Sequence, residues 1–515
     1  LHLRAAEALM SRPRRGRGAR AAIAVHLRAA GAAADPGEAA RFSLEAAREA
    51  GAVYAWDEAI DHAEAAVELL EGTASGHEHA EAAVAAGMLR LKSGRGLPQA
   101  LSLLDTALRE YLRAGDEASA GVVHSRIGGA LALHHSVMDI PRALEHFDAA
   151  ERLLPTPGTA YHLHRGRSQA AMHGLRTSLL AEASDRAESI ATSIGRRDLA
   201  VVAGWARGWA AANEGRLADA AETWERGWRT AHEMADPYLG WMPVNGAALL
   251  ANAYLLDPRT ARSWCRRGLG QPRFTSFAHP HGAVVDQLAL SLAAMGELEG
   301  AHEAADRLPA DAGARRMLLF LDGAWEEAEA SWAAAVAADE AAGDLHDAAL
   351  NLRWLASTRG ALGDREGAVT ALERTLALAC QGPQVPSEIG ARAGLARLLA
   401  EERPAEAEDH VSRCDEILAG GEDWRGLVGQ VELARARVAA GRGDADAADT
   451  ASARAVEVFG THRLPWHEAD ALASWGRLLS RRGCRDEAAD RRAQALRVYA
   501  GIRAADRWRG AVEAP

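Results

Sequence analysis

Few residues in this sequence have the types and spacing that catalysis or phosphate binding requires. The nearest approach to a phosphate-binding loop, GxxxxGK[ST], is GMLRLKS at residues 87–93, which is one residue too short and carries Leu91 in place of the second glycine. The motifs HExxH and GxSxG do not occur, and no GxGxxG follows a strand. We therefore expect no enzymatic activity and no cofactor.

Histidines and cysteines form no recognisable metal-site pattern. The histidine pairs are spaced i,i+1 or i,i+2, whereas two ligands on one helix need i,i+4, and only the pair at 279–281 is expected in a clear loop. The pairs are His77/His79, His134/His135, His162/His164 and His279/His281. The four cysteines, at positions 265, 380, 414 and 484, include no CxxC pair, which argues against a zinc site and a disulfide framework. We expect no bound metal and a reducing compartment.

Charge and hydropathy narrow the classes of partner. The 59 Lys+Arg against 71 Asp+Glu give a net charge of -12, which disfavours binding to nucleic acid or to anionic membrane. The one basic cluster, RPRRGRGAR at 12–20, is typical of a phosphate-contact arm or of an exposed loop. The longest apolar run, at 247–256, is about half a membrane span. We expect a cytoplasmic chain with no membrane contact and no direct nucleic-acid contact.

The elements that would position any site are helical. Alanine-rich segments with apolar residues three and four positions apart run the length of the chain, and no stretch alternates as a strand does. The sequence therefore predicts an all-α fold. A small-x3-large-x2-small element recurs at steps of about forty residues. Its clearest copies are Ala59/Ala63/Ala66, Ala100/Leu104/Ala107, Ala143/Phe147/Ala150, Ala220/Trp224/Gly227, Ala328/Trp332/Ala335, Ala368/Leu372/Thr375 and Ala407/Val411/Cys414.

This element predicts helical hairpins. Positions i, i+4 and i+7 lie along one stripe of a helix, where small residues let a second helix approach and the middle residue fills the gap between them. A glycine five residues before the leading alanine, as at Gly215 and Gly296, marks a helix end that needs a left-handed residue. One step, between Ala301 and Ala328, is only 27 residues, so either a first helix is shortened there or the superhelix is kinked.

The combination of this element with Gly at minus five and, in some copies, at minus twelve is similar to the tetratricopeptide repeat. The period near forty resembles the longer-helix variety in bacterial signal-transduction ATPases and their regulators. The resemblance implies a right-handed superhelical solenoid of about twelve antiparallel helix hairpins. Unrelated helical bundles with alanine-rich interfaces are the alternative. We expect entry or capping helices at 1–50, a first array at 51–309, a second array at 310–500 and a tail at 501–515.

The two ends of the chain carry a second resemblance. LHLRAAEAL at 1–9, AVHLRAAG at 24–31 and YAWDEAIDHAEAAVELL at 54–70 follow the order in which MalT-like and LuxR-type regulators, and ATPases fused to nucleotide cyclases, enter their tetratricopeptide region. LPWHEADALASWGRLL at 464–479 resembles the last repeats of the same proteins. The resemblance implies a fragment of a larger protein, whose ATP-binding and DNA-binding domains are absent from this chain.

A solenoid of this kind lines its concave groove with the first helix of each hairpin. With the leading alanine counted as position 20, positions 2, 5, 9, 12 and 13 face the groove, and their polar and aromatic residues are candidate ligand contacts. The candidates are Trp205, Trp209, Asn213, Asn245, Asn252, Asp286, Arg165 and Arg353, with Arg392 and Arg437 at equivalent positions. We expect Trp205 and Trp209 to be partly exposed and Trp224 to be buried. The alternative is that the tryptophans form one aromatic core layer.

The sequence favours a non-catalytic scaffold or sensor region of a bacterial signal-transduction or transcriptional regulator. It would bind a protein partner, a peptide or a small effector in its concave groove. Two alternatives stay open at this point: an oligomerisation or autoinhibitory arm of a larger ATP-binding enzyme, and a free-standing adaptor.

Overall fold

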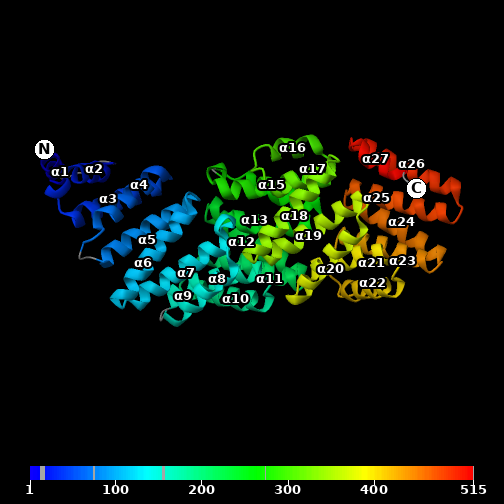
Figure 1. Ribbon diagram of the computed structural model, residues 1–515, viewed down its shortest axis with the longest axis horizontal. Coiled ribbons are helices and arrows are strands. Elements are labelled where there is room, and N and C mark those ends of the chain that lie inside the picture. Colours follow the sequence, from blue (N-terminus) through cyan, green and yellow to red (C-terminus); the bar gives the residue numbers. More distant parts are fainter. Residues whose placement is uncertain (12–17, 74–75, 154–156, 273, 514–515) are drawn as a thin grey trace. The chain divides into compact units, whose positions relative to one another are not determined.

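The computed structural model describes residues 1–11, 18–73, 76–153, 157–272 and 274–513. Throughout these ranges the regular elements are helices, twenty-seven of them α-helices, which confirms the predicted all-α fold (Figure 1). Within the same ranges, no helix combines the length and the apolar character that crossing a bilayer requires. The chain divides into two compact units, Leu1–Ala170 (unit 1) and Ala171–Pro515 (unit 2). The boundaries expected at residues 50, 309 and 500 stay a prediction.

Unit 1 is built from consecutive antiparallel helices. Its elements are α1 (His2–Met10), α2 (Ala19–Ala30), η1 (Gly31–Ala33), α3 (Pro36–Ala52), α4 (Trp56–Leu70), α5 (Gly76–Ser93), α6 (Leu97–Ala114), α7 (Glu117–Leu133), η2 (His135–Val137), α8 (Ile140–Leu153) and α9 (Pro157–His173), the last of which continues into unit 2. Residues 87–93, the nearest approach to a phosphate-binding loop, lie inside α5. Most of the basic cluster at 12–20 lies outside the described residues.

Unit 2 contains the remaining helices. They are α10 (Thr177–Ser193), α11 (Arg197–Asn213), α12 (Leu217–Glu233), α13 (Pro237–Leu249), η3 (Leu250–Tyr254), α14 (Pro258–Leu269), η4 (Phe274–Ser276), α15 (Ala278–Ala294), α16 (Leu298–Ala305), α17 (Gly313–Leu321), α18 (Trp325–Ala342), α19 (Leu345–Leu362), α20 (Arg365–Gln381), α21 (Val385–Leu399), α22 (Pro404–Leu418), α23 (Leu427–Gly441), α24 (Ala445–Thr461), α25 (Pro465–Arg481), α26 (Arg485–Gly501) and α27 (Asp506–Glu513). The short step between Ala301 and Ala328 reflects short helices α16 and α17.

One local expectation is wrong. The pair at 279–281 was expected in a loop, but α15 begins at Ala278 and includes it. Pro280 does not prevent this, because the first N–H groups of a helix have no partner inside the helix and proline is tolerated there.

The helix order gives twelve hairpins, from α3–α4 to α25–α26, in agreement with the predicted repeat number. Trp224 on α12 is the large middle residue of one small-x3-large-x2-small element, and it shows why the facing helices carry glycine. A Cβ atom at Gly208 of its own hairpin would lie 2.3 Å from the Trp224 ring, and one at Gly246 of the next hairpin would lie 2.8 Å from it. The indole therefore fills the space between three helices, as the small-x3-large-x2-small pattern predicts.

The repeats of unit 2 wind through two superhelical turns that pack against each other. The first turn runs from the end of α9 to α18 and the second from α19 to α27. Trp466 at the start of α25 donates its Nε1–H to the carbonyl of Ala293 at the end of α15, at 2.9 Å. Trp508 of α27 donates to Leu321 at the end of α17, also at 2.9 Å. The two pairs are 173 and 187 residues apart in sequence, so each hairpin meets the chain several repeats later.

The contact between the turns follows one rule. The loop inside each hairpin of the first turn contains a residue with positive φ, and that loop lies against the start of a first helix in the second turn. These loop residues are Leu175, Gly215, Leu256, Gly296 and Gly323. We call this contact the inter-turn interface.

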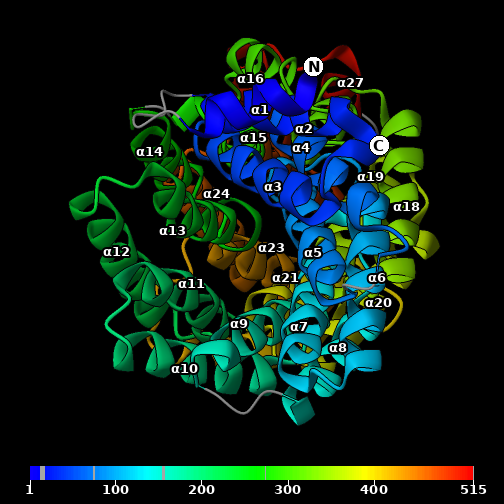
Figure 2. The same ribbon diagram turned by 90° about the vertical axis from the view of Figure 1, so that its left-hand side faces the viewer.

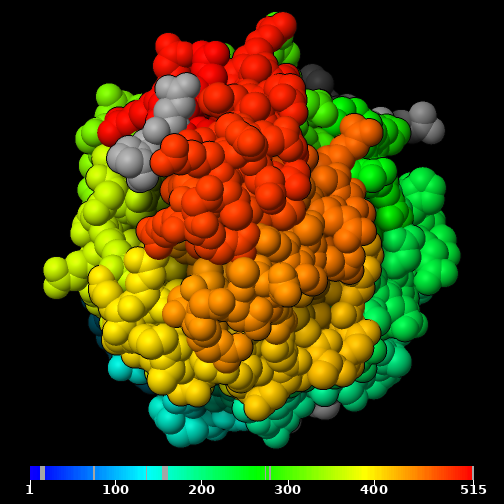
Figure 3. Space-filling view, turned by 90° about the vertical axis from the view of Figure 1, so that its right-hand side faces the viewer, coloured from blue at the N-terminus to red at the C-terminus, as the bar shows by residue number. Residues whose placement is uncertain are grey.

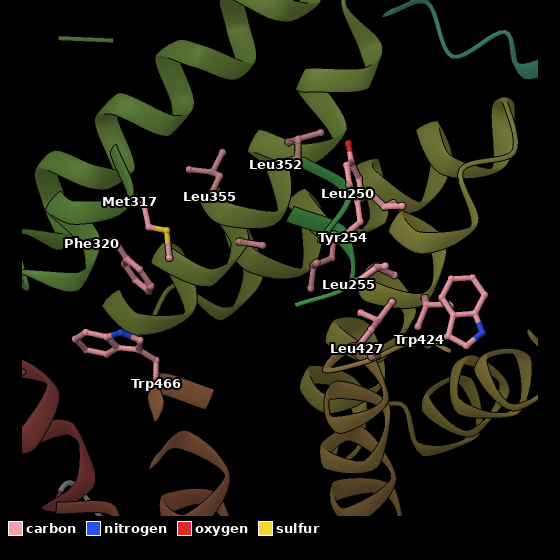
Figure 4. Close-up of a cluster of buried hydrophobic side chains, with 14 of the residues drawn as sticks. Leu250, Tyr254, Leu255, Met317, Phe320, Leu352, Leu355, Trp424, Leu427 and Trp466 are labelled. Atoms are coloured by element: carbon pink, nitrogen blue, oxygen red, sulfur yellow. The ribbon is translucent and has the colours of Figure 1, made fainter. Parts of the chain in front are cut away.

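An apolar core continues across the inter-turn interface. Leu250 and Leu255 of the first turn belong to the same buried cluster as Leu352 of α19 and Trp466 of α25 (Figure 4). Burial of apolar area is the main favourable contribution to folding, so this shared cluster holds the two turns together.

Candidate functional site

The tryptophans Trp205, Trp209 and Trp224 differ in solvent exposure. Trp224 is 1% exposed and Trp205 is half-buried, as expected. Trp209 is 2% exposed, so the expectation of partial exposure was wrong for this residue. The reason is the second superhelical turn, because His346 at the start of α19 packs edge-on against Trp209 with 5.3 Å between ring centroids. Trp209 and Trp224 also pack edge-on, at 5.4 Å, and share a core layer.

Tyr254 lies at the centre of the inter-turn interface. The chain reaches it through the π-helix Leu250–Tyr254, a conformation that changes the direction of the side chains and occurs often at functional sites. The Tyr254 ring is 6.1 Å from Trp209, and its hydroxyl is 3.0 Å from Nε2 of His346. Nη1 of Arg353 donates to the carbonyl of Ala253 in the same π-helix, at 3.2 Å.

A buried hydrogen-bond chain joins Tyr254, His346 and Gln384. Nε2 of Gln384 donates to Nδ1 of His346 at 3.0 Å, so the proton of the neutral ring is on Nε2 and is donated to the Tyr254 hydroxyl. Burial raises the pKa of Tyr254 and lowers the pKa of His346. Both groups are therefore neutral at physiological pH, and the chain is held by neutral hydrogen bonds.

His173 and Asp344 form an ion pair beside this chain. Nδ1 of His173 is 2.8 Å from Oδ2 of Asp344, and the residues are 8% and 1% exposed. Burial lowers the pKa of His173, but the charge of Asp344 and the hydrogen bond outweigh burial, and the pKa is raised. Burial raises the pKa of Asp344, but the charge and hydrogen bond of His173 outweigh it, and the pKa is lowered. Asp344 also caps α19 by accepting from the N–H of Asp347 at 3.1 Å.

Asp339 adds a further acidic group to this cluster. Burial, with the charge of Asp347 as the next cause, raises the pKa of Asp339 to about 7. Nδ2 of Asn351 donates to Asp339 at 2.7 Å. The cluster around α19 therefore contains one carboxyl group, that of Asp339, whose charge changes near neutral pH.

Two of the predicted groove residues have structural roles. Nδ2 of Asn252 donates to the carbonyl of Gln287 at 2.8 Å, and Ser291 donates to Oδ1 of Asn252 at 3.1 Å, which joins η3 to α15. Oδ1 of Asp286 accepts from the N–H of Ala314 in the first turn of α17, at 2.9 Å. Burial raises the pKa of Asp286. These contacts satisfy the two side chains within the repeat array.

The other predicted residues are distributed as follows. Asn213, at the end of α11, is 2% exposed. Asn245 on α13 and Arg353 on α19 are half-buried, and Arg165 is half-buried in the part of α9 that belongs to unit 1. Arg392 donates to its neighbour Glu388 on α21, at 2.8 Å. Seven of the eight predicted residues thus lie in unit 2, and Trp209 and Arg353 approach the inter-turn interface.

Several buried polar atoms on α11 and at the start of α21 have no hydrogen-bond partner in the described part of the chain. On α11 they are Nε1 of Trp205, Nε1 of Trp209 and Nδ2 of Asn213; beside α21 they are Oε1 of Gln384 and Oγ of Ser387. A buried polar group without a partner costs about 1–3 kcal/mol. The same holds for other buried atoms among the described residues, such as Nε1 of Trp332 and of Trp424.

Sequence reasoning missed Tyr254, His346, Gln384, His173 and Asp344. Tyr254 lies in the π-helix, and the hydrogen bonds among the five residues join positions 38 to 171 residues apart. The repeat pattern describes contacts between neighbouring helices only. Of these five residues, only Asp344 could have been singled out from the sequence, because Asp immediately before a helix is a common capping residue.

Among the described residues, no group of three or more His, Cys, Asp or Glu side chains is arranged to hold a metal ion. No family model matches the sequence, and a search of curated proteins returned no match. Solved structures do resemble the chain. A Rap protein complexed with competence and sporulation factor is 10% identical, with a TM-score of 0.36, over 75% of this chain and 99% of that chain. A human IFIT1 dimer with PPP-AAAA is 15% identical, with a TM-score of 0.42, over 74% and 91%. The molecules named are bound to those proteins.

Proposed function

We propose that the chain is a non-catalytic scaffold or sensor region of a bacterial signal-transduction or transcriptional regulator. It binds a protein partner, a peptide or a small effector on the lining of unit 2 formed by α11 and α21. Trp205 on α11 supports this proposal most directly, because it is half-buried and its Nε1–H has no partner among the described residues. A ligand that accepts this hydrogen bond removes its desolvation cost.

The part of the proposal that concerns a regulator is supported by the sequence alone. The segments at 1–9, 24–31, 54–70 and 464–479 resemble MalT-like and LuxR-type regulators in order and texture. A repeat array also suits this role, because its lining offers side chains from many repeats to one ligand. The alternative of an oligomerisation or autoinhibitory arm keeps the same fold but needs no ligand on the lining.

Selection of random linear peptides displayed on phage against the immobilised chain tests the proposal. Enriched peptides should bind the wild-type chain and lose at least tenfold in affinity with Trp205→Ala, since an aromatic anchor typically contributes about 2 kcal/mol or more of affinity. Arg229→Gln, an exposed change on α12, is the matched control and should leave the affinity within twofold. Peptides that bind both variants equally would show that α11 is not the site.

A further inference from the structure

Three hairpin loops contain a residue other than glycine with positive φ. They are Tyr54 between α3 and α4 (φ +62°), Leu175 between α9 and α10 (φ +51°) and Leu256 between η3 and α14 (φ +52°). In each loop one residue precedes this position, and one residue follows it before the next helix begins. Residues with a Cβ atom adopt this conformation rarely. The three loops therefore have the same form.

The three loops differ in what covers them. Leu175 and Leu256 are only 2% and 7% exposed, because both lie in the inter-turn interface. A Cβ atom on Gly426, which precedes α23, would lie 2.6 Å from the carbonyl oxygen of Leu256. In unit 1, by contrast, Tyr54 is 56% exposed and its neighbour Val53 is 52% exposed. We call Val53 and Tyr54 the Tyr54 loop.

Exposed hairpin loops of the second turn are built differently. Gly363, Gly443 and Gly483 have positive φ there and are exposed. Among the described residues, no atom lies within 4 Å of a Cβ atom placed on any of the three. The helices that carry them are coloured yellow-green to red in Figure 3. These loops expose no side chain at the left-handed position, whereas the Tyr54 loop exposes an aromatic one.

The loop at Gly215 shows what a covered hairpin loop packs against. A Cβ atom on Gly215 would lie 3.3 Å from Val385, at the start of α21, and 3.3 Å from Trp424, which precedes α23. The loop therefore lies between the starts of two successive first helices, each of which contributes an apolar side chain.

The start of α13 in the first turn matches the start of α25 in the second turn. Pro237 and Tyr238 are the first two residues of α13, as Pro465 and Trp466 are of α25. Trp466 is 7% exposed, because it donates its hydrogen bond to a hairpin of the first turn. Tyr238 is 48% exposed. The start of α13 thus has the form of a docking surface for a hairpin loop.

Tyr238 belongs to an exposed apolar patch. Its ring packs against that of Phe277, which precedes α15, with 5.3 Å between the ring centroids. Met234, which ends α12, is 40% exposed. The labels α12, α13 and α14 at the left of Figure 2 mark this part of unit 2. We call Met234, Tyr238 and Phe277 the α13 patch, and it includes the starts of two successive first helices.

We propose that the α13 patch binds the Tyr54 loop of a second copy of this chain. The patch and the loop have the forms of the two sides of the inter-turn interface, so the proposed contact repeats one that unit 2 already makes between its own turns. Its formation removes apolar side chains of both surfaces from water. Each copy carries one loop and one patch, so the contact joins different surfaces of two copies. A contact of this size is weak.

The inference concerns a surface other than the lining formed by α11 and α21, and it goes beyond the proposed function. Sedimentation velocity of the full chain from about 1 to about 200 μM tests it. The wild-type chain should sediment faster as its concentration rises, and Tyr54→Asp should abolish this dependence. Aspartate tolerates positive φ better than most residues, so the loop keeps its conformation. Val25→Asp on α2 is the matched control, because Val25 is also 52% exposed but lies outside the loop, and it should behave as the wild type.

A mixture of two variants tests the pairing itself. Tyr238→Asp alone should also stay monomeric, and aspartate is favourable in the first turn of a helix. An equimolar mixture of Tyr54→Asp and Tyr238→Asp should associate again, because the first variant keeps the patch and the second keeps the loop.

Three results would overturn the proposal: a wild-type chain that stays monomeric at every concentration, a mixture that does not associate, or a loss with Val25→Asp as large as that with Tyr54→Asp. The first result would leave the α13 patch to a hairpin loop of a different protein. None of these results concerns peptides that depend on Trp205, so the proposed function would stand or fall separately.

Discussion

His173 and Asp344 are 171 residues apart in the sequence and 2.8 Å apart in the structure, and their ion pair connects the two superhelical turns of unit 2. His173 ends α9 and Asp344 caps α19, so the pair links the end of one helix to the start of another. A buried pair of this kind is strongly destabilising to break from one side, because the remaining charge loses its partner.

The pair predicts how stability depends on pH. The raised pKa of His173 contributes stability that is complete below its unfolded pKa, about 6.5, and is lost as the pH rises through the folded pKa. The lowered pKa of Asp344 contributes stability that is present above about 3.9 and is lost as the pH falls through its folded pKa. Asp339, raised to about 7, adds destabilisation as the pH rises from about 4 to 7. Unit 2 should therefore lose stability as the pH rises from about 4 to 7 through Asp339, and further as it rises above about 6.5 through His173.

Chemical denaturation of wild type and His173→Gln across this range measures the effect. The wild-type chain should lose more unfolding free energy than the variant between pH 6 and pH 9, by about 1.4 kcal/mol for each unit by which the pKa is raised. His302→Gln is the control, because His302 is 46% exposed beside Asp322. Parallel curves for wild type and His173→Gln would contradict the raised pKa.

The tryptophans predict a graded series. Trp224→Ala and Trp209→Ala should each cost about 3–5 kcal/mol, because both indoles are fully buried and leave a cavity. Trp205→Ala should cost clearly less, since Trp205 is half-buried. Urea unfolding of the three variants gives the comparison. A Trp209→Ala cost as small as that of Trp205→Ala would contradict the closed inter-turn interface.

A pair of glycines tests the inter-turn interface directly. Gly296 and Gly443 end equivalent first helices, with φ of +75° and +76°. Alanine at either position should lower the free energy of unfolding by about 1–2 kcal/mol, because the left-handed conformation is unfavourable for it. Only at Gly296 would the new Cβ atom also lie 2.3 Å from Ile502, whereas nothing lies within 4 Å of Gly443.

Gly296→Ala should therefore be more destabilising than Gly443→Ala by about 1–3 kcal/mol, the usual cost of overpacking. Thermal unfolding of the two variants is sufficient. Equal losses of melting temperature would mean that Ile502 of the second superhelical turn does not contact the loop at Gly296.

The repeat pattern predicted the packing contacts between neighbouring helices. It placed Trp224 between Gly208 and the next hairpin, and it placed left-handed glycines such as Gly215 at the hairpin loops. It could not predict that Trp209 is covered, because His346 reaches it from a repeat more than one hundred residues later. Such contacts depend on how small rotations add up over several repeats, which no local spacing records.

The candidate site was predictable only in part. Arg353 was recognised from its position in the repeat, and its guanidinium donates to the carbonyl of Ala253 in the inter-turn interface. Asn252 and Asp286 occupied similar positions but are used to join adjacent helices. A polar residue at a groove position can point toward a ligand or toward a neighbouring helix. The rotation of its helix determines which, and this rotation depends on packing.

The proposal that the lining of unit 2 receives the ligand is tested most directly by hydrogen–deuterium exchange with and without a peptide selected on the chain. We expect slower exchange in α11, the helix that carries Trp205, and in α21, and unchanged exchange in α12 and α24. Protection confined to helices other than α11 and α21, with these two unchanged at saturating peptide, would contradict it.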